Sequence, residues 1–310
     1  MSKILITGGG GFVGNKTANI LSQHGYNVVC FDIIPINKNN KKNLPYKEFW
    51  GSILNPYDID KAIDGCETVI HLAALVGVKS TEQRRLECLH INIRGTSNVL
   101  DAAVKHKVKK VIFSSSSEVY GDQEQFPTSE NADLKPKSNY GISKIAAEEY
   151  VRAYEKFYKL KFNICRFFNI YGSGQKNEFV IPKFAELIKK NEPIKVYGDG
   201  KQIRSYCHVN DAVHGIMNVL QSGKDNTVYN IGNDTEPTSV FDLATKMVEI
   251  SKKKINIEKV PFEKSDRTSN REIYRRQPNI EKIKKDTNYA PKIKLDAGIK
   301  EVLTDKLNLL

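Results

Sequence analysis

A tyrosine and a lysine lie four residues apart in the segment YGISK, as Tyr140 and Lys144. The segment opens a stretch with helical spacing, 139–159, so both side chains are expected on one helix face. A phenol with a pKa of about 10 is a poor base at neutral pH. A neighbouring ammonium group favours the phenolate and makes the tyrosine a candidate general base. The pair therefore predicts a site that removes a proton from a hydroxyl group.

The hydroxyl-rich segment SSSSEVYGD begins at Ser114, directly after the apolar run VIF. Ser116 is the best candidate in it to polarise the oxygen that reacts with Tyr140. Glu118 has two interpretations, a solvated loop carboxylate or an acid or base in the reaction. Tyr120 is interpreted as a structural part of the turn that leaves the strand.

A glycine-rich turn, TGGGGFVG, follows the first expected strand and opens a helix. The spaced glycines Gly8, Gly11 and Gly14 allow a tight turn, close approach to a pyrophosphate and close helix–strand packing. The N-terminus of the helix faces the negative charge. Asp32 ends the second expected strand, 18 residues after Gly14. A carboxylate there accepts both ribose hydroxyls and repels a 2′-phosphate, so the segment predicts a dinucleotide site that prefers NAD to NADP.

The candidate residues lie at the ends of short apolar runs that alternate with helical stretches. Strands are expected at 3–7, 26–32, 68–74, 109–115 and 162–168, and helices at 12–24, 56–64, 83–106 and 139–159. Such alternation is typical of a doubly wound parallel sheet covered on both faces. The predicted fold class is therefore α/β, with residues 1–168 forming an NAD-binding Rossmann domain.

After about residue 168 the pattern changes to short strands, glycine-rich turns and two helical stretches, 178–191 and 238–253. This change predicts a smaller C-terminal α/β lobe for the substrate. We expect it to comprise mainly residues 169–310, with segments near 205–235 returning to the first domain. The stretch 261–279 lacks periodicity and is predicted to be a loop.

Composition narrows the class of protein. Five cysteines at wide spacings, with no CxxC, disfavour a disulfide framework and a metal site. No apolar run approaches the roughly 18 residues of a membrane span, and the N-terminus lacks a signal-peptide pattern, so we expect a cytoplasmic protein with no membrane partner. The net charge of +12 suggests an anionic partner. Because the lysines are scattered, a small molecule is favoured over nucleic acid.

Together these motifs resemble the extended short-chain dehydrogenase/reductases that act on nucleotide sugars, an NAD-dependent epimerase/dehydratase family. The similarity covers nearly the whole chain. It includes HLAA at 71–74, RFFNIYG at 166–172, VYGDGKQIRSYCHVND at 196–211 and RRQPNIEKI at 275–283. The nearest groups are UDP-glucuronate decarboxylases, 4,6-dehydratases and UDP-glucose 4-epimerases.

The resemblance implies two sets of binding residues. The NAD set is Gly8, Gly11, Phe12, Val13, Gly14, Asp32, Ile33, Ser52, Ile53, Leu72, Ala73, Ala74, Asn92, Ser114, Tyr140, Lys144 and Phe167. The nucleotide-diphosphate-sugar set is Val76, Ser116, Glu118, Asn169, Val180, Lys183, Val196, Tyr197, Arg204 and Arg271.

Some of these residues have specific implied roles. Asn169 would touch the sugar or diphosphate, Val196 and Tyr197 would flank the base, and Arg204 would grip the diphosphate, assisted by Arg271 or Arg275. Ser52 is a departure, because many relatives have Asp in this position, where it contacts the adenine amino group. Weaker adenine contacts are expected here.

The resemblance also implies a shared first step. Tyr140 removes the proton of the sugar 4-hydroxyl and hydride passes from C4 to NAD, giving a 4-keto sugar. Related dehydratases and decarboxylases have a Glu where this chain has Glu118, and typical 4-epimerases have a small or hydroxyl residue. Ser117 precedes it, as in decarboxylases and GDP-mannose dehydratases, whereas dTDP-glucose dehydratases have Asp.

The prediction is therefore C4 oxidation followed by C5 chemistry, either 4,6-dehydration or decarboxylation. The alternative is a nucleotide-sugar 4-epimerase. A non-catalytic NAD-binding regulatory protein is disfavoured because Ser116, Tyr140 and Lys144 are all present. Relatives form homodimers through the helices that correspond to 83–106 and 139–159, so a homodimer is expected.

Overall fold

Strand β1 (Lys3–Thr7) sends successive side chains to opposite faces of a sheet. Leu5 packs into the hydrophobic core on one face, whereas Ile4 and Ile6 pack into the core on the other. All three side chains are fully buried. Because both faces are apolar, the strand requires a layer of helices on each side.

The computed structural model describes residues 2–34, 44–264 and 272–305. Its main sheet is seven-stranded and parallel, in the order β11-β6-β5-β4-β1-β2-β3. The other six strands are β2 (Asn27–Asp32), β3 (Lys47–Trp50), β4 (Thr68–His71), β5 (Lys110–Ser116), β6 (Lys161–Phe167) and β11 (Thr227–Ile231). The predicted doubly wound α/β fold is confirmed.

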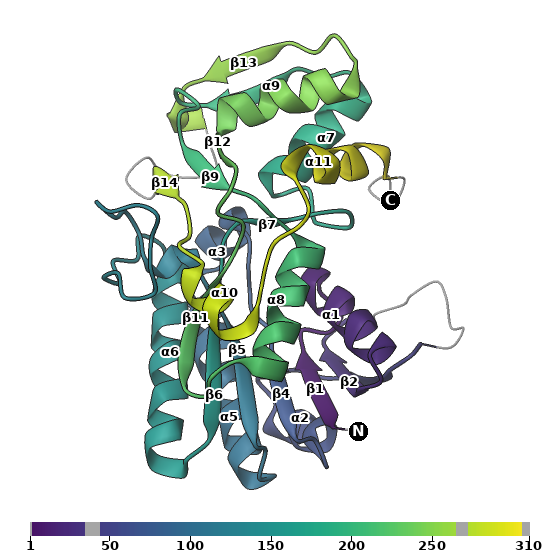
Figure 1. The fold of residues 1–310 in the computed structure, drawn as a ribbon, viewed down its shortest axis with the longest axis vertical. Coiled ribbons are helices and arrows are strands. Elements are labelled where there is room, and N and C mark those ends of the chain that lie inside the picture. Colours follow the sequence, from purple (N-terminus) through teal and green to yellow (C-terminus); the bar gives the residue numbers. More distant parts are fainter. Residues whose placement is uncertain (1, 35–43, 265–271, 306–310) are drawn as a thin grey trace.

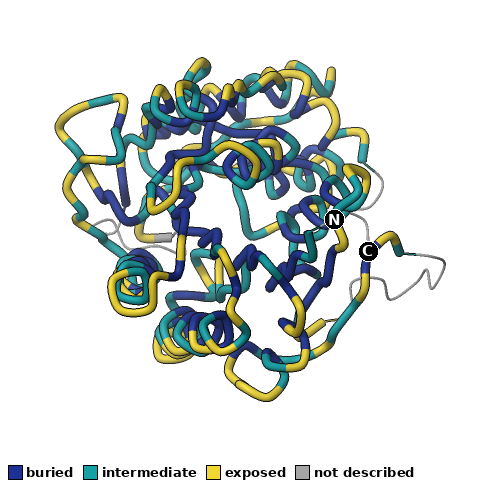
Figure 2. Tube along the Cα trace, turned by 60° about the horizontal axis from the view of Figure 1, so that its bottom comes forward, coloured by how far each residue is buried: buried dark blue, intermediate teal, exposed yellow. Residues whose placement is uncertain are grey.

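Helices cover the two faces of this sheet (Figure 1). One face packs against α2 (Pro56–Ile63), α5 (Gly95–Lys105) and α6 (Asn139–Tyr158). The other face packs against α1 (Phe12–Gln23), α8 (Val209–Ser222) and α10 (Glu281–Thr287). Figure 2 shows the buried segments running through the interior of the molecule, with exposed segments around the outside.

The smaller lobe lies beyond the carboxyl ends of the parallel strands, at the top of Figure 1. Its helices α7 (Val180–Lys190), α9 (Val240–Ser251) and α11 (Leu295–Thr304) share one hydrophobic core. Its short strands pair as β8 (Ile194–Tyr197) with β13 (Ile257–Val260), and as β12 (Pro237–Ser239), β9 (Ile203–Ser205) and β14 (Arg275–Arg276). A further pair, β7 (Ile170–Tyr171) and β10 (Cys207–His208), lies where the chain passes between the two parts.

The expected boundaries differ from the structure in three places. The stretch 83–106 consists of α4 (Arg85–Leu89), a π-helical turn (His90–Arg94) and α5, preceded by the short α3 (Val78–Gln83). Strand β3 was not expected, because KEFW is short and two of its four residues are charged. The stretch 261–279 contains a 3₁₀ turn (Phe262–Lys264) and β14. The division into two domains at residue 168 remains a prediction.

Two further properties concern the described residues, 2–34, 44–264 and 272–305. No helix among them is long and apolar enough to cross a bilayer. Within the same residues, no group of three or more His, Cys, Asp or Glu side chains is placed to hold a metal ion.

Candidate active site

The turn between β1 and α1 is packed too closely to accept a side chain at two of its glycines. Gly8 has a φ of +74° and lies so close to the segment after β4 that a Cβ atom would come within 2.7 Å of the Ala73 nitrogen. A Cβ on Gly14 would lie 2.0 Å from the Gly8 carbonyl oxygen. Gly11 caps α1 without a side chain, and the first turn of α1 contains no acidic residue. Phe12 and Val13 open this helix, so its free N–H groups and positive end suit a pyrophosphate.

Asp32 ends β2 beside this turn. Its carboxylate accepts hydrogen bonds from the backbone nitrogens of Gly10 at 2.9 Å and Ile34 at 3.2 Å. These bonds fix an acid where the ribose of a dinucleotide is expected. Ile33, next to it, is largely exposed. The residues present therefore fit NAD.

Ser52, the departure from the related pattern, has a local structural role. Its hydroxyl accepts a hydrogen bond from the Leu54 nitrogen at 3.2 Å, and its own nitrogen donates to Asp58 Oδ2 at 3.1 Å. Ile53 beside it is buried in the core. A carboxylate, that of Asp58, is thus present near this turn although the Asp of the relatives is missing.

Asn92 lies in the π-helical turn and is almost fully buried. Its side chain accepts from the Leu75 nitrogen at 2.8 Å and donates to the Leu75 oxygen and to Ser143 Oγ. Asn92 therefore fastens the segment after β4, which contains Leu72, Ala73, Ala74 and Val76, to helix α6. π-helical turns are often found at functional sites.

Lys144 is 2% exposed and projects from α6 toward the end of β5. Its Nζ donates to the Ser114 carbonyl oxygen at 2.8 Å and lies 5.7 Å from the centroid of the Tyr140 ring. Burial lowers the pKa of Lys144 to about 8. The structure thus places the predicted pair on one face of α6. Phe167, at the end of β6, is half-buried opposite Ser116 in the β5–β6 register.

Tyr140 lies within the hydrogen-bonding range of Ser116. Burial raises the pKa of the Tyr140 phenol, and the charge of Glu118 acts in the same direction, while the hydrogen bond with Ser116 and the charge of Arg276 oppose them. We expected Lys144 to make the phenolate favourable. In the protein alone the pKa of the Tyr140 phenol is raised instead, because desolvation outweighs the favourable contacts.

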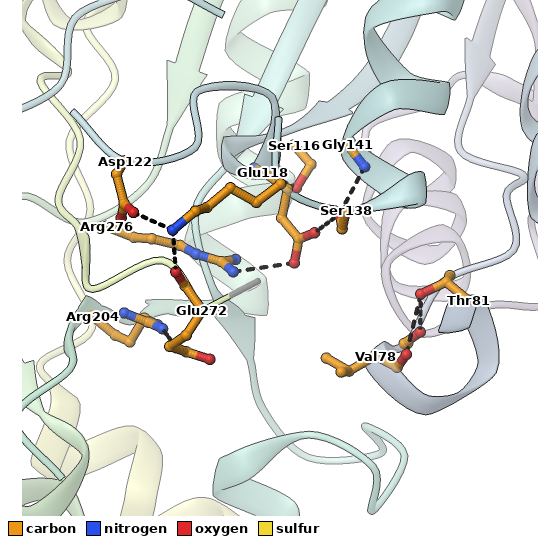
Figure 3. A network of polar contacts seen from close by, with 12 residues as sticks. Val78, Thr81, Ser116, Glu118, Asp122, Ser138, Gly141, Arg204, Glu272 and Arg276 are labelled. Carbon is orange, nitrogen blue, oxygen red and sulfur yellow. Dashed lines mark hydrogen bonds and ion pairs between the residues drawn. The ribbon is translucent and has the colours of Figure 1, made fainter. Parts of the chain in front are cut away.

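Glu118 lies in a 3₁₀ turn, Ser117–Val119, that follows β5 directly. Its backbone nitrogen donates to Ser116 Oγ at 3.2 Å. Its carboxylate accepts from Ser138 Oγ at 2.5 Å and from Arg276 Nη2 at 3.1 Å, and both charged side chains are nearly buried (Figure 3). Glu118 is therefore a fixed side chain between α6 and β14, not a solvated loop residue.

Arg204, the expected diphosphate ligand, lies on β9 and is largely buried. Its guanidinium is ion-paired with Glu272 (Figure 3). It also donates to the carbonyl oxygens of Ile203 and Tyr274. Asn169 has the unusual φ of +38° and donates to the Ser205 carbonyl oxygen at 3.3 Å.

Four other expected substrate residues lie on α7 and β8. Lys183 on α7 lies with its Nζ 5.5 Å from the centroid of the Tyr197 ring, and Val180 begins the same helix. Val196 is fully buried in the core of the lobe, and its expected place beside the base of the nucleotide stays a prediction. Arg271 lies outside the described residues.

The structure adds three residues that sequence reasoning missed, Ser138, Glu272 and Arg276. Ser138 had a local signal, because a serine just before a helical stretch is a typical N-cap. Arg276 lies in the family-like segment RRQPNIEKI, but the sequence indicated no partner for it or for Glu272, since these partners are far away in the chain. The contact between Arg276 and Glu118 spans 158 residues of sequence.

Comparison with known proteins agrees with this geometry. A model of the family described as "NAD dependent epimerase/dehydratase family" matches residues 4–232. The UDP-N-acetyl-alpha-D-glucosaminuronate decarboxylase of Bacillus cytotoxicus is 34% identical, over 97% of this chain and 96% of its own. A putative UDP-glucose 4-epimerase of Methanocaldococcus jannaschii is 33% identical, over 97% of both chains.

Solved structures of nucleotide-sugar enzymes share the fold of this chain. The UDP-glucuronic acid 4-epimerase of Bacillus cereus, in complex with UDP-glucuronic acid and NAD, superposes with a TM-score of 0.88. It is 26% identical, and the match covers 97% of this chain and 98% of that one. The predicted enzyme class and the NAD cofactor are confirmed. The chain belongs to the NAD dependent epimerase/dehydratase family.

Proposed function

We propose that this protein oxidises a nucleotide-linked hexuronate at C4 and then releases its C6 carboxylate as carbon dioxide. The contact between Glu118 and Arg276 carries the proposal. It places a paired cation and anion beside Ser116, close to the base that starts the reaction.

The first step is C4 oxidation. Tyr140 accepts the proton of the 4-hydroxyl, and Ser116 hydrogen-bonds the same oxygen and stabilises the carbonyl that forms. Lys144 supplies a positive charge on the same helix face, which opposes the desolvation of the phenolate. Bound NAD supplies the hydride acceptor. The glycine turn and Asp32 hold its pyrophosphate and ribose.

The second step follows from the chemistry of the intermediate. A 4-keto sugar with a carboxylate at C6 is a β-keto acid, so its C5–C6 bond breaks without a base. The bonding electrons move into the C4 carbonyl as an enolate, carbon dioxide leaves, and C5 then takes up a proton. A substrate carboxylate suits Arg276, whose buried Nε has no hydrogen-bond partner among the described residues.

Dehydration fits the site less well. Loss of the C6 hydroxyl requires an acid that protonates it as it leaves. Ser117 stands where dTDP-glucose dehydratases have Asp, and it is buried. Glu118 is occupied by two donors, Ser138 and Arg276. This arrangement favours a fixed carboxylate over one that moves to abstract a C5 proton.

A 4-epimerase is the second candidate. The likeness to the UDP-glucuronic acid 4-epimerase of Bacillus cereus favours it. In that case the contact between Glu118 and Arg276 holds two segments together and takes no part in the reaction.

The test is to incubate the purified protein and NAD with UDP-glucuronic acid, its N-acetylated 2-amino analogue and UDP-glucose. Mass spectrometry of the products separates the reactions. Loss of carbon dioxide from a uronate supports the proposal, whereas an unchanged mass with inversion at C4 supports the epimerase. Loss of water from UDP-glucose would instead identify a dehydratase.

Replacing Glu118 with Gln is expected to reduce carbon dioxide release by about 10- to 100-fold, the range for losing a hydrogen bond to a charged group. The amide cannot pair with Arg276 as an anion, so the guanidinium that would bind the substrate carboxylate loses a partner that fixes its position. Solvent deuterium at C5 and release of carbon dioxide are the measurements. The exposed Glu124→Gln, in the same loop region, is the control and should behave as the wild type. Unchanged release by Glu118→Gln would show that this carboxylate takes no part.

We further propose that the protein is a homodimer. Helix α6 has an exposed apolar stripe, Ile142, Tyr150 and Phe157, the last of them 74% exposed. At about 100° per residue these side chains fall on one face, and the exposed Leu86 lies on α4, which contacts α6. Light scattering is expected to give a dimer mass for the wild type and a monomer mass for the double variant Tyr150→Glu, Phe157→Glu. The control Tyr57→Glu, on α2, should remain dimeric, and a monomeric wild type would refute the proposal.

A further inference from the structure

Ser138 forms hydrogen bonds in two directions with one hydroxyl group. As the N-cap of α6 it accepts a hydrogen bond from the Gly141 nitrogen at 3.0 Å. The same oxygen donates its proton to Glu118 Oε2 at 2.5 Å. A hydroxyl has one proton and two lone pairs, so both contacts form at once. Figure 3 shows Ser138 between the helix and the carboxylate.

The direction of each bond is fixed by its partners. The Gly141 nitrogen can only donate, and an ionised carboxylate can only accept. The proton of Ser138 is therefore committed to Glu118. Because Arg276 Nη2 holds the other oxygen of Glu118 at 3.1 Å, both carboxylate oxygens are fixed, one by α6 and one by β14.

The packing beneath this contact is tight. A Cβ atom on Gly141 would lie 2.8 Å from the Glu118 carbonyl oxygen. The 3₁₀ turn that carries Glu118 is thus pressed against the first turn of α6, where Tyr140 also lies. Ser138 joins the helix of Tyr140 to the Glu118 carboxylate by a hydrogen bond.

We propose that Ser138 is a positioning residue that holds Glu118 in register with Tyr140 for the step at C5. This inference rests on the proposed function. Without the proton of Ser138, the Glu118 carboxylate loses the hydrogen bond that ties it to the start of α6. The carboxylate then turns toward the guanidinium of Arg276, which can bind both oxygens. It moves away from the sugar, while Tyr140 and C4 oxidation are unaffected.

Helix capping and positioning can be separated by substitution. Ser138→Thr retains both contacts. Ser138→Asp remains a good N-cap but has no proton to donate at neutral pH and places a second negative charge beside Glu118. Ser138→Gly retains most of the capping preference and has no donor. The three variants therefore differ mainly in whether residue 138 can donate a hydrogen bond to Glu118, and much less in how well it caps α6.

The experiment uses the full chain with NAD and UDP-glucuronic acid. Reduced-nicotinamide absorbance after rapid mixing reports C4 oxidation, and carbon dioxide release reports the C5 step. In Ser138→Gly and Ser138→Asp we expect carbon dioxide release to fall by about 10- to 100-fold, the range for losing a hydrogen bond to a charged group. The absorbance burst, which reports C4 oxidation, should remain. Ser138→Thr should restore release, and all three variants should melt near the wild-type temperature.

The outcomes separate the two proposals. If the wild type releases carbon dioxide and the Gly and Asp variants release it equally fast, the positioning role of Ser138 is refuted and the proposed function stands. A parallel fall of burst and release, or a failure of Thr to restore release, indicates a purely structural cap and also refutes it. A wild type that only inverts C4, with no deuterium entering C5, refutes the proposed function and this inference together.

Discussion

Replacing Tyr140 with Phe is expected to slow C4 oxidation by about 10²- to 10⁴-fold, the usual contribution of a positioned general base. The ring remains, so the packing of α6 is retained, but the atom that accepts the proton is lost. Ser116 is hydrogen-bonded to that phenol and cannot replace it, because a serine hydroxyl beside Tyr140 has no base of its own. Stopped-flow absorbance of the reduced nicotinamide measures the effect directly.

Tyr120→Phe is the matched control. Its hydroxyl donates to Asn230 Oδ1 at 2.6 Å and accepts from Arg166 Nη1 at 3.1 Å, in the interior. Removing it should lower the free energy of unfolding by about 1–3 kcal/mol and leave the absorbance burst intact. A Tyr140→Phe protein that oxidises its substrate at the wild-type rate would remove Tyr140 from the mechanism.

The parts of the site that sequence could predict are local. The four-residue spacing of Tyr140 and Lys144 sets a common helix face, and the spacing of Gly8, Gly11 and Gly14 sets a turn whose close contacts exclude side chains. Both follow from backbone geometry over a few residues.

The parts that sequence could not predict depend on how distant segments dock. Arg204 was expected to be available for a diphosphate, but Glu272 pairs with it from a strand-end segment far along the chain. Val196 was expected beside a base, and its place in β8 turns its side chain into the lobe's core. Side-chain direction in a short strand changes with each residue, and its pattern alone did not indicate which face was buried.

Tyr140 also shows why a motif does not determine a pKa. The ammonium of Lys144 and the phenol share a face, which the sequence indicates. Desolvation by the whole fold raises the pKa of the phenol more than its neighbours lower it. The balance of these effects depends on burial, which involves every element packed around the site.

Behind the catalytic residues, Arg166 and Glu148 form an ion pair with 2% and 0% of their side chains exposed. Arg166 binds both oxygens of Glu148, at 2.9 and 2.7 Å, and Ser115 Oγ donates to the same carboxylate at 2.6 Å. Burial alone would raise the pKa of Glu148, but the hydrogen bonds and charge of Arg166 hold it below its usual value. The pair fastens α6 to β5 and β6 directly behind Ser114 and Ser116.

Replacing Glu148 with Ala is expected to lower the free energy of unfolding by about 3–5 kcal/mol, because it leaves the Arg166 guanidinium buried without its anion. Urea denaturation followed by circular dichroism measures the loss. The double variant Glu148→Leu, Arg166→Met removes both charges and should lose much less, since breaking one side of a buried pair costs more than replacing both sides. A double variant as unstable as Glu148→Ala would instead show that packing around α6, and not the unpaired charge, dominates the loss.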